Sequence, residues 1–144
     1  MLTQDTKYDL DIDIEITVDA PIERVFEALI HRMGAGNKGA ENAPMPMVLE
    51  RRPGGRWFRD LGDDAGHLWG HVQSIRPPSL LEICGPLMMS APVTNNVITR
   101  LKETDAGTVV TFRHTAHGPV EPEWEDGMRE GWAEWLGDVK ADSE

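Results

Sequence analysis

A strict alternation of apolar and polar residues near the N-terminus constrains the fold of this 144-residue chain more than any other feature. From Tyr8 to Val18, apolar residues occupy every second position, and acidic residues or threonine occupy the positions between them. Successive side chains of a β-strand point to opposite faces, so the pattern predicts a half-buried strand with an acidic outer face. The chain therefore has to build a sheet whose core lies on one side of this strand.

A helix is predicted directly after this strand. Proline is favoured in the first turn of a helix, because its missing N–H would have no partner there, and Pro21 occupies this place. The next apolar residues recur at helical spacing and predict an amphipathic helix over 21–32: Ile22, Val25, Phe26, Leu29 and Ile30. Residues 33–46 are rich in Gly, Asn, Ala and Pro, which indicates a loop with room for one short helical turn.

The middle of the chain is typical of an antiparallel sheet. Apolar runs rich in β-formers alternate there with turns such as Pro53-Gly54-Gly55 and Asp105-Ala106-Gly107. Residues 85–92 form a second irregular segment with two methionines at its centre. The predicted strands cover residues 47–52, 56–61, 67–76, 80–84, 94–104 and 108–117.

The last element is predicted to be a long helix with one apolar stripe. The stripe follows steps of four, four, three and four residues and consists of Trp124, Met128, Trp132, Trp135 and Val139. Gly127 and Gly131 lie one turn apart in it, and each costs about 1 kcal/mol of helix stability relative to alanine. Either a close approach to the sheet or room for a ligand would explain the two glycines.

The order of these elements predicts an α+β fold with about seven antiparallel strands and helices on one face of the sheet. We expect a single domain over residues 1–144, with a core from about residue 8 to 140. A sheet of this size crossed by one amphipathic helix can enclose a concave apolar site, which is where small ligands usually bind.

The charge distribution excludes some classes of partner. The net charge is −11, and the two ends are acidic: residues 1–20 carry six acidic residues against one basic, and residues 121–144 carry nine against two. We expect no binding to nucleic acid or to an anionic membrane, because both require a basic surface. The single Cys84 rules out an intramolecular disulfide, and the N-terminus lacks a signal-peptide pattern, so we expect a cytoplasmic location.

The order and spacing of several short motifs resemble one known group of proteins. The motifs are Ala20-Pro21, Pro53-Gly54-Gly55, Gly70-His71-Val72 with Pro77-Pro78, Gly107-Thr108, and Gly131-Trp132. They resemble the SRPBCC superfamily (START-like, helix-grip fold), in the branch named for the heat-shock-protein-90 ATPase activator. The resemblance implies a curved antiparallel sheet wrapped around the C-terminal helix, with a cavity between them. Relatives include lipid and hormone binders and polyketide cyclases, so the fold does not fix one activity.

The function that we favour is binding of a small, largely apolar ligand in this cavity, without a cofactor. Met128, Trp132 and Trp135 are expected to line its helix side. Its sheet side is assigned to Trp57, Trp69 and Phe112, its polar groups to His71 and His114, and Phe26 completes the predicted ligand-binding set. The assignment of His71 assumes that it shares one strand face with Trp69.

Two alternative functions stay open at this level. A cavity enzyme of the polyketide cyclase or hydrolase type would use His71 or His114 as a base, so catalysis is left undecided, with binding favoured. An interaction module related to stress or chaperones would expose methionines such as Met45 and Met88, and a homodimer also stays open. A metal site is not expected, because His67 and His71 would lie about 13 Å apart on one strand face.

Overall fold

The computed structural model describes residues 7–144 of the chain, and the first six residues of the predicted acidic N-terminal stretch lie outside the described part. Seven antiparallel strands form one sheet in the order β1-β7-β6-β5-β4-β3-β2. The strands are β1 (Lys7–Val18), β2 (Val48–Leu49), β3 (Arg56–Gly62), β4 (Ala65–Arg76), β5 (Leu80–Gly85), β6 (Thr94–Thr104) and β7 (Gly107–Val120). Two α-helices, α1 (Ile22–Met33) and α2 (Pro122–Ser143), and a short 3-10 helix over Ala40–Asn42 complete the fold.

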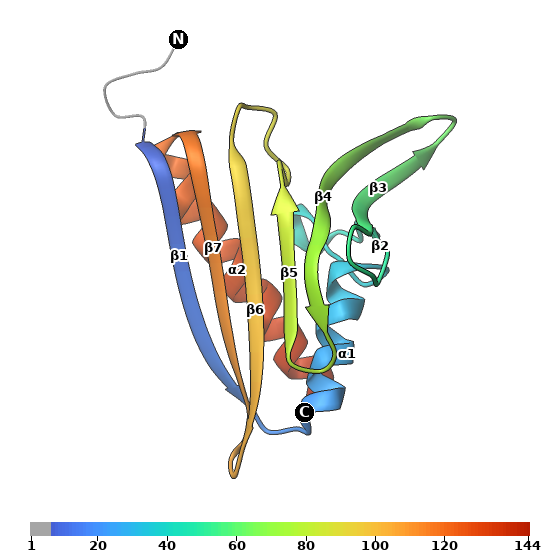
Figure 1. The fold of residues 1–144 in the computed structure, drawn as a ribbon, viewed down its shortest axis with the longest axis vertical. Helices are drawn as coiled ribbons and strands as arrows, with labels where there is room; N and C mark the ends of the chain where they lie inside the picture. The colour runs from blue at the N-terminus through green and yellow to red at the C-terminus, as the bar shows by residue number, and fades with distance from the viewer. Residues whose placement is uncertain (1–6) are drawn as a thin grey trace.

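Both α-helices lie on one face of the curved sheet (Figure 1), with α2 crossing the strands obliquely and its C-terminal end beside α1. The predicted α+β architecture, with a curved antiparallel sheet of seven strands around a long C-terminal helix, is confirmed. The loop predicted after the first helix is also confirmed, and it carries its single short helical turn at Ala40–Asn42.

The alternation in β1 decides which side of the sheet holds the core. Leu10, Ile12 and Val18 are buried, whereas Asp11 and Asp13 are exposed on the outer face. β1 pairs with β7 along its whole length, so the outer face of one strand continues into the other. The apolar face is covered by the helices, because burial of these side chains is the main favourable contribution to folding.

α1 packs its apolar stripe against the sheet. Every residue of the predicted stripe is buried, and Met33 extends it by one turn. Phe26 is 1% exposed and belongs to this interior. α1 also ends where the pocket described below begins, because Met33 and the segment after it lie at the pocket's edge.

One irregularity in the pairing of β3 and β4 changes the predicted faces of β4. Trp57 pairs with Gly70, but Phe58 pairs with Leu68, so Trp69 is the extra residue of a β-bulge. A bulge shifts the alternation of the bulged strand by one residue. Trp69 is therefore buried on the helix side, while His71 is exposed. The prediction that Trp69 and His71 share one face is wrong for this reason.

Candidate functional site

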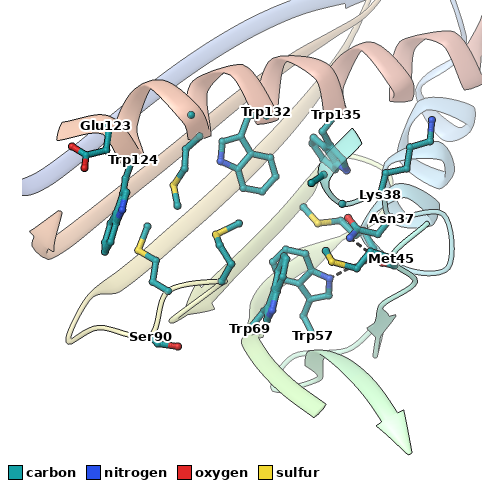
Figure 2. Close-up of a pocket in the computed structure, with 18 residues that line it drawn as sticks. Asn37, Lys38, Met45, Trp57, Trp69, Ser90, Glu123, Trp124, Trp132 and Trp135 are labelled. Carbon is teal, nitrogen blue, oxygen red and sulfur yellow. Dashed lines mark hydrogen bonds between the residues drawn. The ribbon is translucent and has the colours of Figure 1, made fainter. Parts of the chain in front are cut away.

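A pocket of about 840 Å³ lies between α2, the segment after α1, strands β3 and β4, and the loop between β5 and β6 (Figure 2). All five tryptophans of the chain line it: Trp57, Trp69, Trp124, Trp132 and Trp135. Five of the seven methionines line it as well: Met33, Met45, Met88, Met89 and Met128. These two residue types supply large, polarisable apolar surfaces, and methionine can adapt its shape to a ligand.

The sheet side of the pocket is built around two tryptophans whose indole rings meet edge to face. The ring centroids of Trp57 and Trp69 are 5.1 Å apart, with an interplanar angle of 82°. Trp57 is 1% exposed, and its Nε1–H donates a hydrogen bond of 2.7 Å to the carbonyl oxygen of Met33. That bond ties β3 to the end of α1 and fixes the Trp57 ring at the wall of the pocket.

The helix side of the pocket is opened by two glycines. Gly127 and Gly131 both line the pocket, and a Cβ atom built on either would meet no atom within 4 Å. Of the two explanations that the sequence allowed, close approach to the sheet is therefore wrong for these glycines. They leave open space next to Met128 and Trp132.

His114 lies beneath this wall and does not line the pocket. It is fully buried, and Trp132 Nε1–H donates a hydrogen bond of 3.0 Å to its Nδ1. Its proton is therefore on Nε2, which lies 2.6 Å from the Oδ1 of Asn95. Burial lowers the pKa of His114 to about 4, so the ring is neutral at physiological pH. Both nitrogens have protein partners, which makes His114 a positioning residue for Trp132.

The hydrogen bonds continue from His114 to the rim of the pocket. Asn95 Nδ2 donates to the carbonyl oxygen of Pro86 at 3.2 Å and lies 3.7 Å from the sulfur of Met89. A buried polar chain thus links α2, β7, β6 and the loop that carries Met88 and Met89. Such a chain specifies one relative placement of these elements, because an unpaired buried polar group is costly.

Polar side chains gather at two places on the pocket. Asn37 and Lys38, from the segment after α1, lie near Trp135, and Lys38 Nζ is 3.8 Å from an oxygen of Asp138 on α2. Ser90 and Glu123 lie toward the other end, near Trp124 (Figure 2). The lining is otherwise apolar or glycine, which suits a ligand with a large apolar body.

The structure brings five of the nine predicted ligand-binding residues together in this pocket: Trp57, Trp69, Met128, Trp132 and Trp135. Phe112 lies behind them, with its ring centroid 4.7 Å from that of Trp132. Phe26 and His114 are buried in the interior, and His71 is on the outer face. None of these four predicted residues lines the pocket. The bulge in β4 turns His71 to the outer face, whereas Phe26, Phe112 and His114 lie deeper in the packed interior, a depth that the spacing of apolar residues does not give.

A comparison with family models gives the relationship of this fold to known proteins. Residues 19–141 match the model of the Activator of Hsp90 ATPase homolog 1-like proteins. The chain belongs to this family. The predicted resemblance to the corresponding SRPBCC branch is thereby confirmed. No curated protein matches the chain in a sequence search.

Solved structures share the fold of this family member at low sequence identity. Protein CV1439 from Chromobacterium violaceum is similar with a TM-score of 0.71 and 15% identity, over 92% of this chain and 96% of that chain. Protein MLL2253 from Mesorhizobium loti gives a TM-score of 0.69 and 17% identity, over 92% and 95%. The di-domain ARO/CYC StfQ from the steffimycin biosynthetic pathway gives 0.64 and 14%, over 94% of this chain and 51% of that chain. At these identities the likeness concerns the fold alone.

Several lining residues of this family member were outside the predicted site. Trp124 lies on the predicted helix stripe, and the stripe was the signal that could have placed it in the pocket. Met45, Met88 and Met89 come from irregular segments, where no periodicity gives the direction of a side chain.

Within the described residues, no group of three or more His, Cys, Asp or Glu side chains could hold a metal ion. Neither helix of residues 7–144 is long and apolar enough to cross a membrane.

Proposed function

We propose that this chain, acting as the single domain predicted from its length, binds a small, largely apolar ligand between the sheet and α2. The observation that carries the proposal is the gathering of all five tryptophans and five methionines around one pocket of about 840 Å³. Monomeric proteins seldom concentrate their largest apolar side chains around empty space, because filling that space would stabilise the fold.

The two glycines of α2 support the same proposal. An alanine at Gly127 or Gly131 would favour the helix and would meet no neighbouring atom. Glycine at both positions thus weakens the helix while it keeps the pocket wide. A ligand that occupies this space and contacts Trp132 would account for both choices.

The two other candidate functions receive less support. The predicted cyclase-type enzyme would use a histidine base, and among the described lining residues the titratable side chains are Lys38 and Glu123, with no histidine. An interaction module would be expected to fill its cavity with its own side chains. Of these two alternatives we favour the enzyme, because the fold is similar to that of StfQ, which is named an ARO/CYC.

The test of the proposal is native mass spectrometry of gently purified protein, followed by analysis of its organic extract. We expect a stoichiometric added mass that is lost on denaturation. The same spectrum gives the oligomeric state and so tests whether the chain forms a homodimer. Gly131→Leu should remove the added mass, because its side chain extends into the pocket. Gly137→Leu is the matched control, since Gly137 lies on α2 outside the pocket with no atom within 4 Å of its Cβ position. An added mass that survives in Gly131→Leu would contradict the proposal.

A further inference from the structure

The charged groups of the pocket lining do not balance one another. Among the described residues that line the pocket, two side chains are charged at neutral pH, Lys38 and Glu123. Lys38 Nζ lies 3.8 Å from a carboxylate oxygen of Asp138, so the protein itself supplies its counter-charge. The carboxylate of Glu123 forms no ion pair and no hydrogen bond within residues 7–144. The uncompensated charge of the lining is therefore negative.

The rest of α2 adds negative charge to the helix side of the pocket. The helix carries seven acidic residues and two basic ones, Arg129 and Lys140. Neither basic residue lines the pocket, because both side chains donate to backbone carbonyl oxygens of β1. The positive end of the helix dipole amounts to about half a charge, which the two carboxylates of the first turn, Glu123 and Glu125, outweigh. Charge of one sign along an apolar cleft attracts a ligand of the opposite sign.

The apolar lining is also of a kind that holds cations. The face of an indole ring is negative in electrostatic potential, and tryptophan is the aromatic side chain that attracts ammonium groups best. All five tryptophans line the pocket, and Trp124 lies at the same end as Glu123 (Figure 2). The β5–β6 loop, which reaches this end with Ser90, has no charged residue over 86–93. Lys38, the one basic residue of the described lining, lies at the other end.

We propose that the pocket recognises an apolar molecule that carries a positive charge, as a protonated or quaternary amine, with its cationic head at the Trp124 end. The indole face of Trp124 and the carboxylate of Glu123 stabilise the head, and the apolar body extends along α2 toward Trp135. A carboxylate ligand would instead place its charge against that of α2. The net charge of −11 adds to the attraction of a cation at longer range. This inference rests on the proposed function and adds the chemical class of the ligand.

The test uses three probes that share a naphthylmethyl body and carry tetrahedral heads of similar shape but different charge. They are (2-naphthylmethyl)trimethylammonium, 2-neopentylnaphthalene and 2-naphthylmethanesulfonate, with permanently positive, neutral and negative heads. Isothermal titration calorimetry gives the dissociation constant of each. The unchanged protein should bind the ammonium probe at least about tenfold more tightly than the sulfonate probe, because the indole faces and the carboxylate attract one head and repel the other.

A pair of charge-removing variants locates the head. Glu123→Gln keeps the shape of the side chain and should lower the preference for the ammonium over the neutral probe about three- to fivefold, the strength of one exposed ion pair. Glu130→Gln is the matched control, since it removes the same charge from the same helix about 10 Å away and outside the pocket lining. It should leave the preference within about 1.5-fold, because physiological salt screens charges over that distance.

The outcomes separate the charge of the ligand from the pocket itself. Equal binding of the ammonium and sulfonate probes, or equal losses in Glu123→Gln and Glu130→Gln, would overturn the cationic head and leave the proposed apolar pocket standing. Tighter binding of the sulfonate probe, lost in Lys38→Met, would overturn it in favour of an anion. Failure of all three probes to bind the unchanged protein would overturn the proposed function as well.

Discussion

At the scale of single residues, His114 is held by contacts on both ring nitrogens. Trp132 donates a hydrogen bond to Nδ1, and Oδ1 of Asn95 accepts one from Nε2–H. The neutral ring with its proton on Nε2 is therefore the form that completes both hydrogen bonds. A protonated ring would carry a second N–H toward the indole N–H of Trp132. Burial in the same place lowers the pKa of His114 to about 4, which keeps the ring in the neutral form.

This pKa predicts how stability depends on pH. In the unfolded chain His114 has its ordinary pKa of about 6.5, so below that pH the unfolded state binds the proton more tightly than the folded state. The stability contributed by the neutral ring is complete above about pH 6.5. It falls as the pH is lowered toward about 4, by up to about 3 kcal/mol.

The check is urea unfolding between pH 4 and 7 for the unchanged protein and for His114→Gln. Glutamine accepts from Trp132 and donates to Asn95 but does not titrate, so its free energy of unfolding should fall less over this window. Carboxylates affect both proteins equally and cancel in the difference. Parallel curves for the two proteins would contradict the prediction.

At the scale of elements, α2 divides into two halves with different surroundings. Its buried residues all lie from the middle of the helix to its C-terminal end: Trp132, Leu136, Val139 and Ser143. The first half contributes Trp124, Gly127 and Met128 to the pocket and is packed less tightly. The second half therefore holds the helix against the sheet, while the first half forms a wall that a ligand can contact.

The glycines of the first half predict an unusual gain in stability. Gly127→Ala and Gly131→Ala should each raise the free energy of unfolding by about 1 kcal/mol, because the helix gains propensity and the new methyl group meets no atom within 4 Å. Urea unfolding of the ligand-free protein measures this. Gly70→Ala is the contrasting control, since its Cβ would lie 2.7 Å from the carbonyl oxygen of Cys84 and should destabilise β4. A loss of stability in both helix variants would contradict the prediction, because it would mean that other side chains lie closer to residues 127 and 131 than the structure shows.

At the scale of the whole molecule, the C-terminal end of α2 is fastened to two other elements. Arg32 of α1 forms two hydrogen bonds with Asp142, at 2.6 and 2.9 Å, and lowers the pKa of that carboxyl. Lys140 Nζ donates to the carbonyl oxygen of Thr17 at 2.8 Å, at the end of β1. Glu144 accepts from the backbone N–H of Asp19 at 2.9 Å. These contacts hold the C-terminal end of α2 beside α1 and the end of β1.

Two arginine–aspartate pairs with the same geometry but different exposure test this fastening. The side chains of Arg32 and Asp142 are 16% and 31% exposed, whereas those of Arg113 and Asp11 on the outer face are 53% and 52% exposed. Arg32→Ala should lower the free energy of unfolding by about 1–2 kcal/mol, because a partly buried pair is less screened by water. Arg113→Ala should cost clearly less than Arg32→Ala, because water screens an exposed pair. Thermal unfolding of the two variants decides this, and equal losses would mean that the α1–α2 pair does not hold the helix in place.

Much of the fold follows from local periodicity. The spacing of apolar residues along the chain predicts the alternation of β1, the stripe of α1, the succession of strands along the chain and the long terminal helix. The structure contains each of these features. The two glycines of α2 were also visible in the sequence, which left close approach to the sheet and room for a ligand as equal explanations until the structure showed open space beside them. These features are local, because a strand or helix fixes the direction of its side chains from the spacing of its own residues.

Only the tertiary structure decided which side chains reach the pocket. The bulge at Trp69 depends on how β4 pairs with β3, and it moved His71 to the outer face. His114 lies below the pocket surface, where it is hydrogen-bonded to residues 18 and 19 positions away along the chain. The methionines of the loops were placed by packing against other elements. The sequence by itself determined the elements and their apolar faces; pairing, depth and the meeting of distant side chains came from the folded chain, because they depend on contacts that no local pattern encodes.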